Sequence, residues 1–404
     1  MTAGDAPAVV VGAGPAGGNI ALAMVEAGIR TILVDDNPAA GGQVWRRPRI
    51  GLGLAGLIGT DGRGDALRAR LETASRQGGL VVWGSSEAID VDAKNRTLWA
   101  LVGGTRIEAT RWRALVLATG AVEHYLPVPG WTASGVFGVA GLQAMMKGTG
   151  VLPSGRIVLA GVGPLLYLVA AQLCRLGSPP LCVVDAAPSP SFAALRQMAR
   201  APGLLGLGLR CLAVLRRYGV TVRRKTAVTA IATEDDGLLL DFRRLDARAV
   251  ETVRADCLAL GFGVRPNIEA ALLAGCDVEY DPGGRYWLPV TDRSGRSSVA
   301  GVYLAGDCAG IRGVDLAEMQ APAVAAAVLD DLGRAIPDDL RCRIADGQSR
   351  IARLEAFRAG LAAWTRLPEA LFDLADDATV VCRCEAVTFA ELRAADTTGF
   401  GSPR

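Results

Sequence analysis

AVVVGAGPAG, at positions 8–17, sets the fold of this chain. These ten residues begin as a β-branched run and end in a glycine-rich turn, and residues 18–27 then have the composition of a helix. A second apolar run covers residues 30–34 and stops at Asp35. The order strand, glycine turn, helix, strand and acid predicts a βαβ unit.

The spacing of the glycines predicts what this unit binds. Gly12 allows a tight turn, Gly14 lets the backbone approach a pyrophosphate, and Gly17 lets the helix pack closely on the strand. The first turn of the helix directs partial positive charge at the phosphates. Asp35 follows Gly12 by 23 residues, a distance that suits an acid that binds a ribose. The cofactor contacts predicted here are Gly12, Gly14, Pro15, Ala16, Gly17, Asp35 and Asp36.

Three later segments predict further contacts with the same cofactor. A Gly-Gly pair at 41–42 follows the acids, and an apolar strand at 115–117 ends in a turn of small residues. Another apolar strand, 302–305, ends in a Gly-Asp pair, whose backbone N–H groups and carboxylate suit the far end of a long flavin cofactor. The contacts predicted from these segments are Gly42, Gln43, Ala118, Thr119, Gly120, Gly306 and Asp307.

A second glycine loop repeats the first one in a degenerate form. Gly161 and Gly163 are present, but Leu166 stands where the third glycine belongs and should hinder close packing of helix and strand. Asp185 follows Gly161 by 24 residues and would repel a 2′-phosphate, so NADPH is not expected. Gly161, Gly163 and Asp185 therefore predict either a site for NAD, ATP or ADP or a structural relic. Weak or no nicotinamide binding is favoured.

These segments predict an α/β fold with two dinucleotide-binding domains, the second inserted within the first. Residues 1–125 and 265–335 are the predicted Rossmann-like FAD-binding domain, and residues 126–264 are the predicted NAD-type domain. An Arg-rich amphipathic pattern predicts a helix over about 341–366. Residues 336–404 are predicted to be a small C-terminal α unit.

The composition excludes several classes of function. The 404 residues contain 43 Lys+Arg and 41 Asp+Glu, and a net charge of +2 makes no electrostatic case for nucleic acid or an anionic membrane as a partner. Lysine is nearly absent, which disfavours Schiff-base catalysis. His124 is the only histidine, which excludes multi-histidine metal sites and most catalytic triads. No catalytic residue is predicted.

The nine cysteines contain no CxxC or CxxxxC pair, so no redox-active disulfide of the flavoprotein-reductase type is predicted. Scattered free thiols favour a reducing, cytoplasmic setting. The longest uncharged stretch, residues 157–174, reaches the length of a membrane span, but two glycines and a proline interrupt it. A strand, a turn and a helix are predicted there, and no transmembrane segment.

The order of these motifs resembles the flavoprotein α-subunit family of heteromeric amine dehydrogenases. Its members include the A subunit of opine oxidase, the α subunit of hydroxyproline dehydrogenase and the B subunit of hydrogen cyanide synthase. The resemblance covers about residues 8–390, and its most specific marks are GPLL at 163–166 and CRCE at 382–385, with LPVPGW at 126–131 in support. It implies the two-dinucleotide-domain flavoprotein fold, bound FAD at the first site, and FMN at a subunit interface.

The same resemblance implies the partners of the chain. An amino-acid-oxidase-type flavoprotein β subunit would hold the amine substrate, a small ferredoxin-like subunit is a further candidate, and the complex would be cytoplasmic or peripheral to the inner membrane. Cys382 and Cys384 match the first two ligands of a 2Fe–2S cluster in a shortened BFD-like segment. The second cysteine pair of the family is missing from this sequence, so a complete cluster is not expected in this chain alone.

The sequence leaves three candidate functions to be tested. The first is an electron-transfer flavoprotein subunit whose partner oxidises an amine or amino acid. The second, motivated by the second glycine loop and Asp185, is a stand-alone NADH-dependent FAD oxidoreductase. The third is a non-catalytic assembly subunit that binds an adenine nucleotide. The first is favoured, because the motif order supports it and no acid–base constellation is present.

Overall fold

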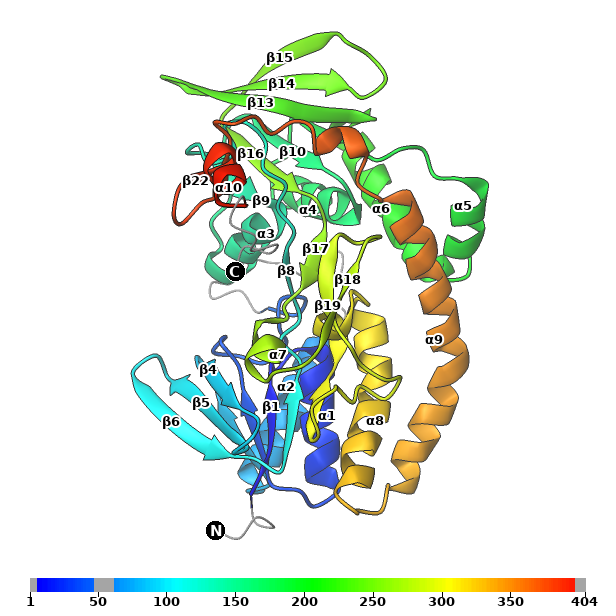
Figure 1. Ribbon diagram of the computed structural model, residues 1–404. Helices are drawn as coiled ribbons and strands as arrows, with labels where there is room; N and C mark the ends of the chain where they lie inside the picture. Colours follow the sequence, from blue (N-terminus) through cyan, green and yellow to red (C-terminus); the bar gives the residue numbers. More distant parts are fainter. Residues whose placement is uncertain (1–5, 47–61, 397–404) are drawn as a thin grey trace. The chain divides into compact units, whose positions relative to one another are not determined.

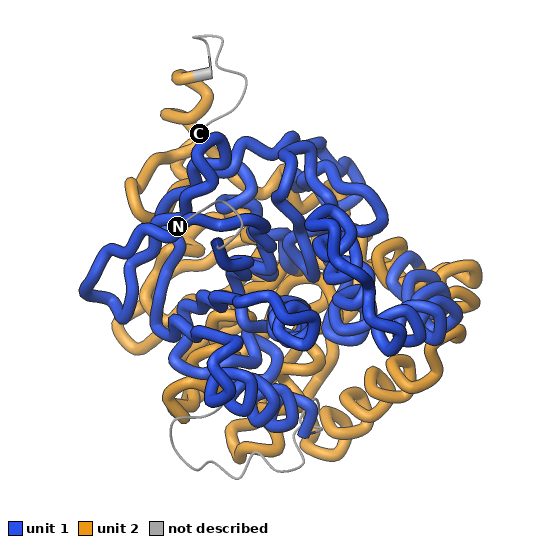
Figure 2. The backbone as a smooth tube through the Cα atoms, turned by 90° about the horizontal axis from the view of Figure 1, so that it is seen from below, with its two compact units in different colours: residues 1–122, 264–359 blue, residues 123–263, 360–404 orange. Residues whose placement is uncertain are grey.

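A computed structural model describes residues 6–46 and 62–396 (Figure 1). Residues 1–5, 47–61 and 397–404, which the predicted domain ranges include, lie outside the described residues. The chain divides into two compact units (Figure 2). Unit 1 comprises residues 1–122 and 264–359, and unit 2 comprises residues 123–263 and 360–404.

Unit 1 is built on a five-stranded parallel sheet in the order β20-β7-β1-β2-β3. Its strands are β1 (Ala8–Val11), β2 (Thr31–Val34), β3 (Leu80–Trp83), β7 (Ala114–Leu117) and β20 (Val302–Leu304). The helices of this unit include α1 (Pro15–Glu26), α2 (Arg63–Arg76) and α8 (Val314–Asp331). Strand β1 lies at the centre, with Val11 opposite Val34 on one side and Leu117 on the other.

The two faces of this sheet have separate cores, because successive side chains of a strand point to opposite faces. Ala8 and Val10 pack in a cluster with α1, α2 and α8. Val9 and Val11 pack in a second cluster that includes Trp112 and residues of an antiparallel sheet. That sheet comprises β4 (Glu87–Asp92), β5 (Thr97–Val102) and β6 (Arg106–Arg111). Burial on both faces explains why the parallel strands read as continuous apolar runs.

The remaining elements of unit 1 lie mostly in the second stretch of chain that belongs to it, residues 264–359. They are β17 (Val264–Pro266), α7 (Glu269–Leu273), β18 (Val278–Asp281), β19 (Tyr286–Pro289), the 3-10 helix η2 (Gly306–Ala309) and most of α9 (Asp338–Trp364). Strand β8 (Ala121–Glu123) lies where the first stretch, residues 1–122, ends. Helix η2 directly follows β20, so the predicted Gly-Asp pair lies at the carboxyl end of a sheet strand.

Unit 2 repeats this plan with a five-stranded parallel sheet in the order β12-β11-β10-β16-β9. The strands are β9 (Val136–Gly138), β10 (Ile157–Gly161), β11 (Cys182–Asp185), β12 (Thr221–Arg224) and β16 (Cys257–Gly261). The helices are α3 (Val139–Thr149), α4 (Pro164–Arg175), α5 (Phe192–Met198) and α6 (Pro202–Arg217). A three-stranded antiparallel sheet follows, formed by β13 (Thr226–Glu234), β14 (Gly237–Arg244) and β15 (Val250–Ala255).

The uncharged stretch 157–174 forms β10, a turn and α4, as predicted from its internal glycines. Within the described part of the chain, no single helix is long and apolar enough to cross a membrane. The bent helix pair α5 and α6 meets the length and composition criteria only when the two helices are taken together.

The C-terminal residues are shared between the units. Helix α9 begins in unit 1, where Leu340 joins the core beside α8, and it ends in unit 2. The chain then forms η3 (Glu369–Leu371), β21 (Val380–Cys382), β22 (Val387–Thr388) and α10 (Phe389–Asp396). Leu371 is buried in the core of unit 2. The range 336–404, predicted as one C-terminal unit, thus makes its contacts partly with each unit.

Candidate cofactor and nucleotide sites

The first glycine loop is shaped by two contacts that leave no room for a side chain. Gly12 has a φ of +103°, and a Cβ there would lie 2.2 Å from the carbonyl oxygen of Ala118 on the neighbouring strand. A Cβ on Gly17 would lie 1.9 Å from the carbonyl oxygen of Gly12. Both glycines therefore serve the packing of β1, α1 and β7.

Gly14 differs from these two glycines because a side chain there would meet no close neighbour. Its φ of −71° suits any residue, and the nearest atom to a Cβ there would be Gly42 Cα at 3.9 Å. Gly14 is the N-cap of α1, Pro15 occupies the first turn, and that turn contains no acidic side chain. Among the described residues, no side chain caps the first N–H groups of this helix, and a bound phosphate would complete them.

Asp35 lies at the end of β2, and the protein binds both of its carboxylate oxygens. Oδ2 accepts a 2.5 Å hydrogen bond from the Ala13 N–H, and Oδ1 accepts bonds from the backbone and side-chain amides of Asn37. The side chain is buried, and this burial raises the pKa of Asp35, with the hydrogen bonds acting in the opposite direction. Asp36, the next residue, is exposed and accepts a bond from Asn37. Asp35 thus fixes the glycine loop to the end of β2.

The later cofactor segments converge on the start of α1. A Cβ on Gly42 would lie 3.0 Å from Gly14 Cα, and one on Gly306 would lie 3.0 Å from Ala16 Cβ. Gln43 follows with an exposed side chain. Ala118 touches both loop glycines, since a Cβ on Gly17 would lie 3.0 Å from its Cβ.

Thr119 and Gly120, which follow Ala118 in the chain, are the other two cofactor contacts predicted from this segment. Thr119 donates a 2.7 Å bond to the Asn267 carbonyl, and Gly120 has a φ of +74° with open space around it. Every cofactor residue predicted in unit 1 thus lies at the carboxyl ends of β1, β2, β7 and β20, in the loops that follow, or in the first turns of α1 and η2. This is the edge where doubly wound sheets bind nucleotides.

Asp307 presents one occupied and one available carboxylate oxygen. Oδ1 accepts 2.7 Å bonds from the N–H groups of Arg312 and Gly313, which hold the loop before α8. Oδ2 has no hydrogen-bond donor among residues 6–46 and 62–396. An acceptor left open beside a glycine suits a hydroxyl-bearing ligand such as the ribityl chain of FAD.

The residues of unit 1 therefore fit FAD. Gly14 and the start of α1 offer N–H groups and an open surface to the pyrophosphate, and Asp307 offers an acceptor to a hydroxyl. Cys308 adds a feature that the sequence did not indicate. Its thiol is fully buried, with Sγ 3.1 Å from the Leu117 carbonyl oxygen, and burial raises the pKa of this thiol.

The second glycine loop has a buried leucine at the position of the third glycine. A Cβ on Gly161 would lie 1.9 Å from the Gly261 carbonyl oxygen, so this contact of β10 with β16 again requires glycine. Leu166 is almost fully buried. A Cβ on Gly261 would lie 2.9 Å from Val139 and 3.6 Å from Leu166. Val139 is therefore the neighbour that leaves no room for a side chain at position 261, and Leu166 lies at an ordinary contact distance. That Leu166 hinders close packing stays a prediction from the sequence pattern.

The ribose-type acid of unit 2 has an unexpected partner. Tyr167, on the first turns of α4, donates a 2.6 Å hydrogen bond to Asp185 Oδ2, and the Ala187 N–H binds Oδ1. All these groups are buried, and burial raises the pKa values of Asp185 and Tyr167. Gly163, by contrast, has open space around it, as Gly14 does in unit 1. The phosphate loop is thus open while the acid is engaged by a tyrosine.

The two predicted metal ligands lie on a short hairpin in unit 2. Cys382 Sγ and Cys384 Sγ are 3.3 Å apart, and no group of three or more His, Cys, Asp or Glu suited to a metal occurs in the described residues. The hairpin is fixed to Trp131, whose indole N–H donates to the Val380 carbonyl. Arg383 stacks 5.3 Å from the Trp131 ring centroid and donates to the Trp131 and Val136 carbonyls. Two thiols fit part of a cluster's ligand set and do not complete it.

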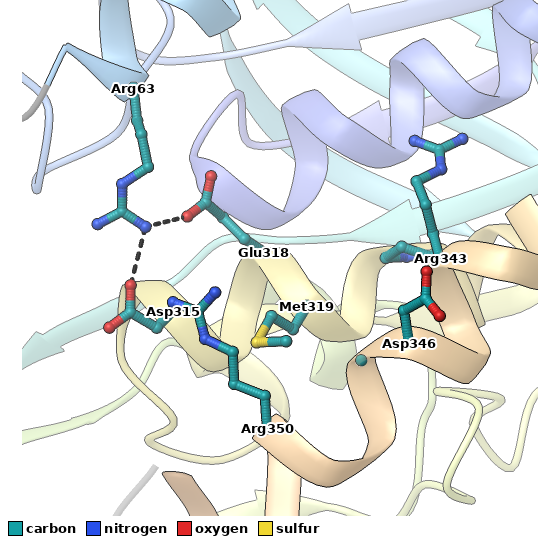
Figure 3. A pocket seen from close by; sticks show the side chains of 9 residues that line it. Arg63, Asp315, Glu318, Met319, Arg343, Asp346 and Arg350 are labelled. Atoms are coloured by element: carbon teal, nitrogen blue, oxygen red, sulfur yellow. Dashed lines mark hydrogen bonds and ion pairs between the residues drawn. The ribbon is translucent and has the colours of Figure 1, made fainter. Parts of the chain in front are cut away.

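A cavity of about 720 Å³ lies in unit 1, between the start of α2 and helices α8 and α9 (Figure 3). It holds none of the predicted cofactor residues. Arg63 reaches across it to the carboxylates of Asp315 and Glu318, and Arg350 points towards the same region from α9. Its lining residues are Arg63, Asp315, Glu318, Met319, Pro322, Arg343, Asp346, Gly347 and Arg350.

Comparison with known proteins identifies the family. Residues 6–325 match the family described as pyridine nucleotide-disulphide oxidoreductase. The chain belongs to this family. The A subunit of opine oxidase from Rhizobium meliloti (strain 1021) is 36% identical over 98% of this chain and 86% of its own length. The HcnB subunit of hydrogen cyanide synthase from Pseudomonas aeruginosa (strain PAO1) is 31% identical over 96% of this chain and 84% of its own length.

Solved structures agree in fold. Thioredoxin reductase from T. acidophilum superposes with a TM-score of 0.59 at 17% identity, over 81% of this chain and 98% of that chain. L-proline dehydrogenase from P. horikoshii gives a TM-score of 0.56 at 17% identity, over 84% of this chain and 58% of that chain. Identities this low show the fold alone.

These findings confirm three predictions from the sequence: the resemblance to the family of these opine oxidase and hydrogen cyanide synthase subunits, the two-domain α/β flavoprotein fold, and an FAD-dependent oxidoreductase. A pyridine nucleotide-disulphide oxidoreductase carries FAD and pyridine nucleotide sites, and unit 1 and unit 2 contain the corresponding loops. The individual cofactor contacts stay predictions.

Proposed function

We propose that this chain is the flavin-containing electron-transfer subunit of a heteromeric amine or amino-acid dehydrogenase, of the opine, hydroxyproline or glycine class. A partner subunit of amino-acid-oxidase type would oxidise the substrate. The observation that carries the proposal is the near full-length similarity, at 36% and 31% identity, to proteins named as single subunits of an opine oxidase and a hydrogen cyanide synthase.

The chemistry of the described residues supports an electron-transfer role. Bound FAD would supply the exchange of one or two electrons. Gly14 and the start of α1 would hold its pyrophosphate, and Asp307 would accept a bond from a cofactor hydroxyl. Cys308 is a buried free thiol whose pKa is raised by its burial, which disfavours it as half of a redox disulfide. The chain therefore offers a cofactor cradle with no thiol relay beside it among the described residues.

The engagement of Asp185 disfavours the stand-alone NADH oxidoreductase. A ribose hydroxyl would have to displace or share the buried Tyr167 hydroxyl in order to bind this carboxylate. The open Gly163 loop leaves the phosphate part of the site intact. The engagement of Asp185 would weaken the binding of NAD, ATP and ADP alike, because all three carry the adenosine ribose. An interfacial FMN, a ferredoxin-like partner and a shared 2Fe–2S cluster stay predictions from the family resemblance.

Anaerobic absorbance spectroscopy of the purified chain tests this function. The chain is expected to show oxidised flavin bands that neither NADH nor octopine, hydroxyproline or glycine bleaches. The same amines are expected to bleach the flavin once the amino-acid-oxidase-type subunit is coexpressed and copurified. Gly14→Ala, which should weaken cofactor binding without disturbing the fold, serves as the low-flavin control.

Each alternative gives a different spectrum. Bleaching by NADH within seconds would replace the proposal with the stand-alone reductase. Turnover of an amine by the chain alone would refute a separate substrate subunit. A colourless protein that ATP or ADP stabilises against heat would point to the non-catalytic assembly subunit.

A further inference from the structure

Helices α5 and α6 of unit 2 form an unusual basic and apolar pair. Residues 192–217 contain five arginines and no acidic residue. The chain as a whole is only +2, so this segment of +5 differs strongly from the rest. The two helices meet at an angle of 111°, with a three-residue break between them.

The outward faces of both helices carry large apolar side chains. Phe192 is 83% exposed, Leu195 is 45% exposed, and Leu209 is 60% exposed. Both helices already have a buried face, made by Ala194 and Met198 in α5 and by Cys211 and Leu215 in α6. The exposed apolar residues are therefore additional to the packing that holds these helices in place.

The arginines of this segment are unpaired. All five side chains are exposed, and within the described residues none makes an ion pair or a side-chain hydrogen bond. Some exposed arginines elsewhere in the chain do form ion pairs, as with Arg76 and Glu72 or Arg343 and Asp339. The five are Arg196, Arg200, Arg210, Arg216 and Arg217. Their charge is therefore available to an anionic partner.

We infer that α5 and α6 form a docking surface for an anionic lipid membrane, on which the two helices lie in the interfacial plane. Exposed aromatic and leucine side chains next to unpaired arginines are the combination that binds lipid headgroups and the upper acyl region. Like-charge repulsion opposes a second copy of the chain as the occupant, because it would bring the same five arginines to the contact. Charge complementarity thus favours lipid phosphates.

Vesicle cosedimentation with the full chain tests this surface. The chain is expected to sediment with vesicles of phosphatidylcholine and phosphatidylglycerol, to stay in solution with phosphatidylcholine alone, and to be released by salt. The Arg196→Gln/Arg200→Gln double variant should lower the partition coefficient about 25-fold, at roughly fivefold per arginine. Phe192→Ser should lower it as well, without changing the thermal melting point, because the side chain is exposed.

Matched changes elsewhere provide the controls. Ile107→Ser replaces a side chain that is 64% exposed on β6 of unit 1, and it should leave sedimentation unchanged. Failure of the full chain to bind the anionic vesicles, or equal losses in the Ile107 control, would overturn the inference. If the arginine variant keeps its vesicle binding but loses the copurifying partner subunit, the surface is a protein interface instead.

Discussion

The Tyr167 hydroxyl donates a 2.6 Å hydrogen bond to Asp185 Oδ2 inside unit 2. The pair joins the first turns of α4 to the end of β11, at the position where a dinucleotide fold usually keeps its acid for a ribose. In unit 1, the donors to the equivalent Asp35 among the described residues are backbone N–H groups and the Asn37 amide. Asp35 of unit 1 and Asp185 of unit 2 occupy equivalent positions but have different hydrogen-bond donors.

Tyr167→Phe is expected to destabilise unit 2. The change leaves a buried carboxylate oxygen without its donor, which costs about 1–3 kcal/mol. Urea unfolding followed by far-UV circular dichroism measures the loss. Tyr218→Phe, at the end of α6 and 45% exposed, is the control and should change stability little. Equal stability of Tyr167→Phe and the wild type would show that the hydrogen bond contributes nothing.

Two glycines of the first loop are expected to respond oppositely to alanine. Gly14→Ala adds a methyl group in open space, so the apoprotein should melt normally while the dissociation constant of FAD rises about tenfold or more, ~1.4 kcal/mol. Gly17→Ala forces a Cβ against the Gly12 carbonyl oxygen and should destabilise the fold itself by about 1–3 kcal/mol or more. Flavin titration and thermal melts separate the effects, and normal FAD affinity in Gly14→Ala would remove the phosphate role of this residue.

The lowered pKa of Asp256 predicts that the free energy of unfolding depends on pH. Hydrogen bonds from Arg156 lower the pKa of Asp256 from 3.8 to about 2. Because the folded-state pKa is depressed, the carboxylate stabilises the fold above its unfolded pKa of 3.8, and this contribution is lost as the pH falls towards about 2.

Denaturant unfolding between about pH 7 and pH 3 tests the sign of this effect. Asp256→Asn should be less stable than the wild type near neutral pH and should approach it as the pH falls below the unfolded pKa of 3.8. Asp235→Asn, in the exposed β13–β14 turn, should follow the wild type throughout. A gap between Asp256→Asn and the wild type that widens towards low pH would contradict this role for the carboxylate.

Arg383 is expected to hold the cysteine hairpin in its folded conformation. Arg383→Met removes the two bonds to the Trp131 and Val136 carbonyls and the stacking on the indole, so local opening should become easier by about 1–2 kcal/mol. Proteinase K should then cleave within residues 376–390 about 5–30-fold faster, with an unchanged melting point for the core. Arg366→Met, an exposed change in the same tail, is the control. Unchanged cleavage in Arg383→Met would mean that other contacts hold the hairpin.

Local patterns were sufficient to predict the main elements. The run at 8–17 gives β1, the turn and α1, and the helix begins at Pro15, slightly before the predicted start. The repeat of this pattern at 157–175 gives β10 and α4. Such segments are predictable because strand and helix formation depend on residues adjacent in sequence and on their periodicity. The division of the C-terminal residues between the units could not be predicted, because it depends on which core Leu340 and Leu371 join.

Short motifs with fixed spacing were enough to predict the two glycine loops, the acids that follow them and the family resemblance. Three relationships needed the folded chain: Gly261 lies beside Leu166, Tyr167 donates a hydrogen bond to Asp185, and Arg383 stacks on Trp131. The members of these pairs lie 95, 18 and 252 positions apart in the chain. No local period relates such residues, and the packing of sheets and helices sets which of them meet.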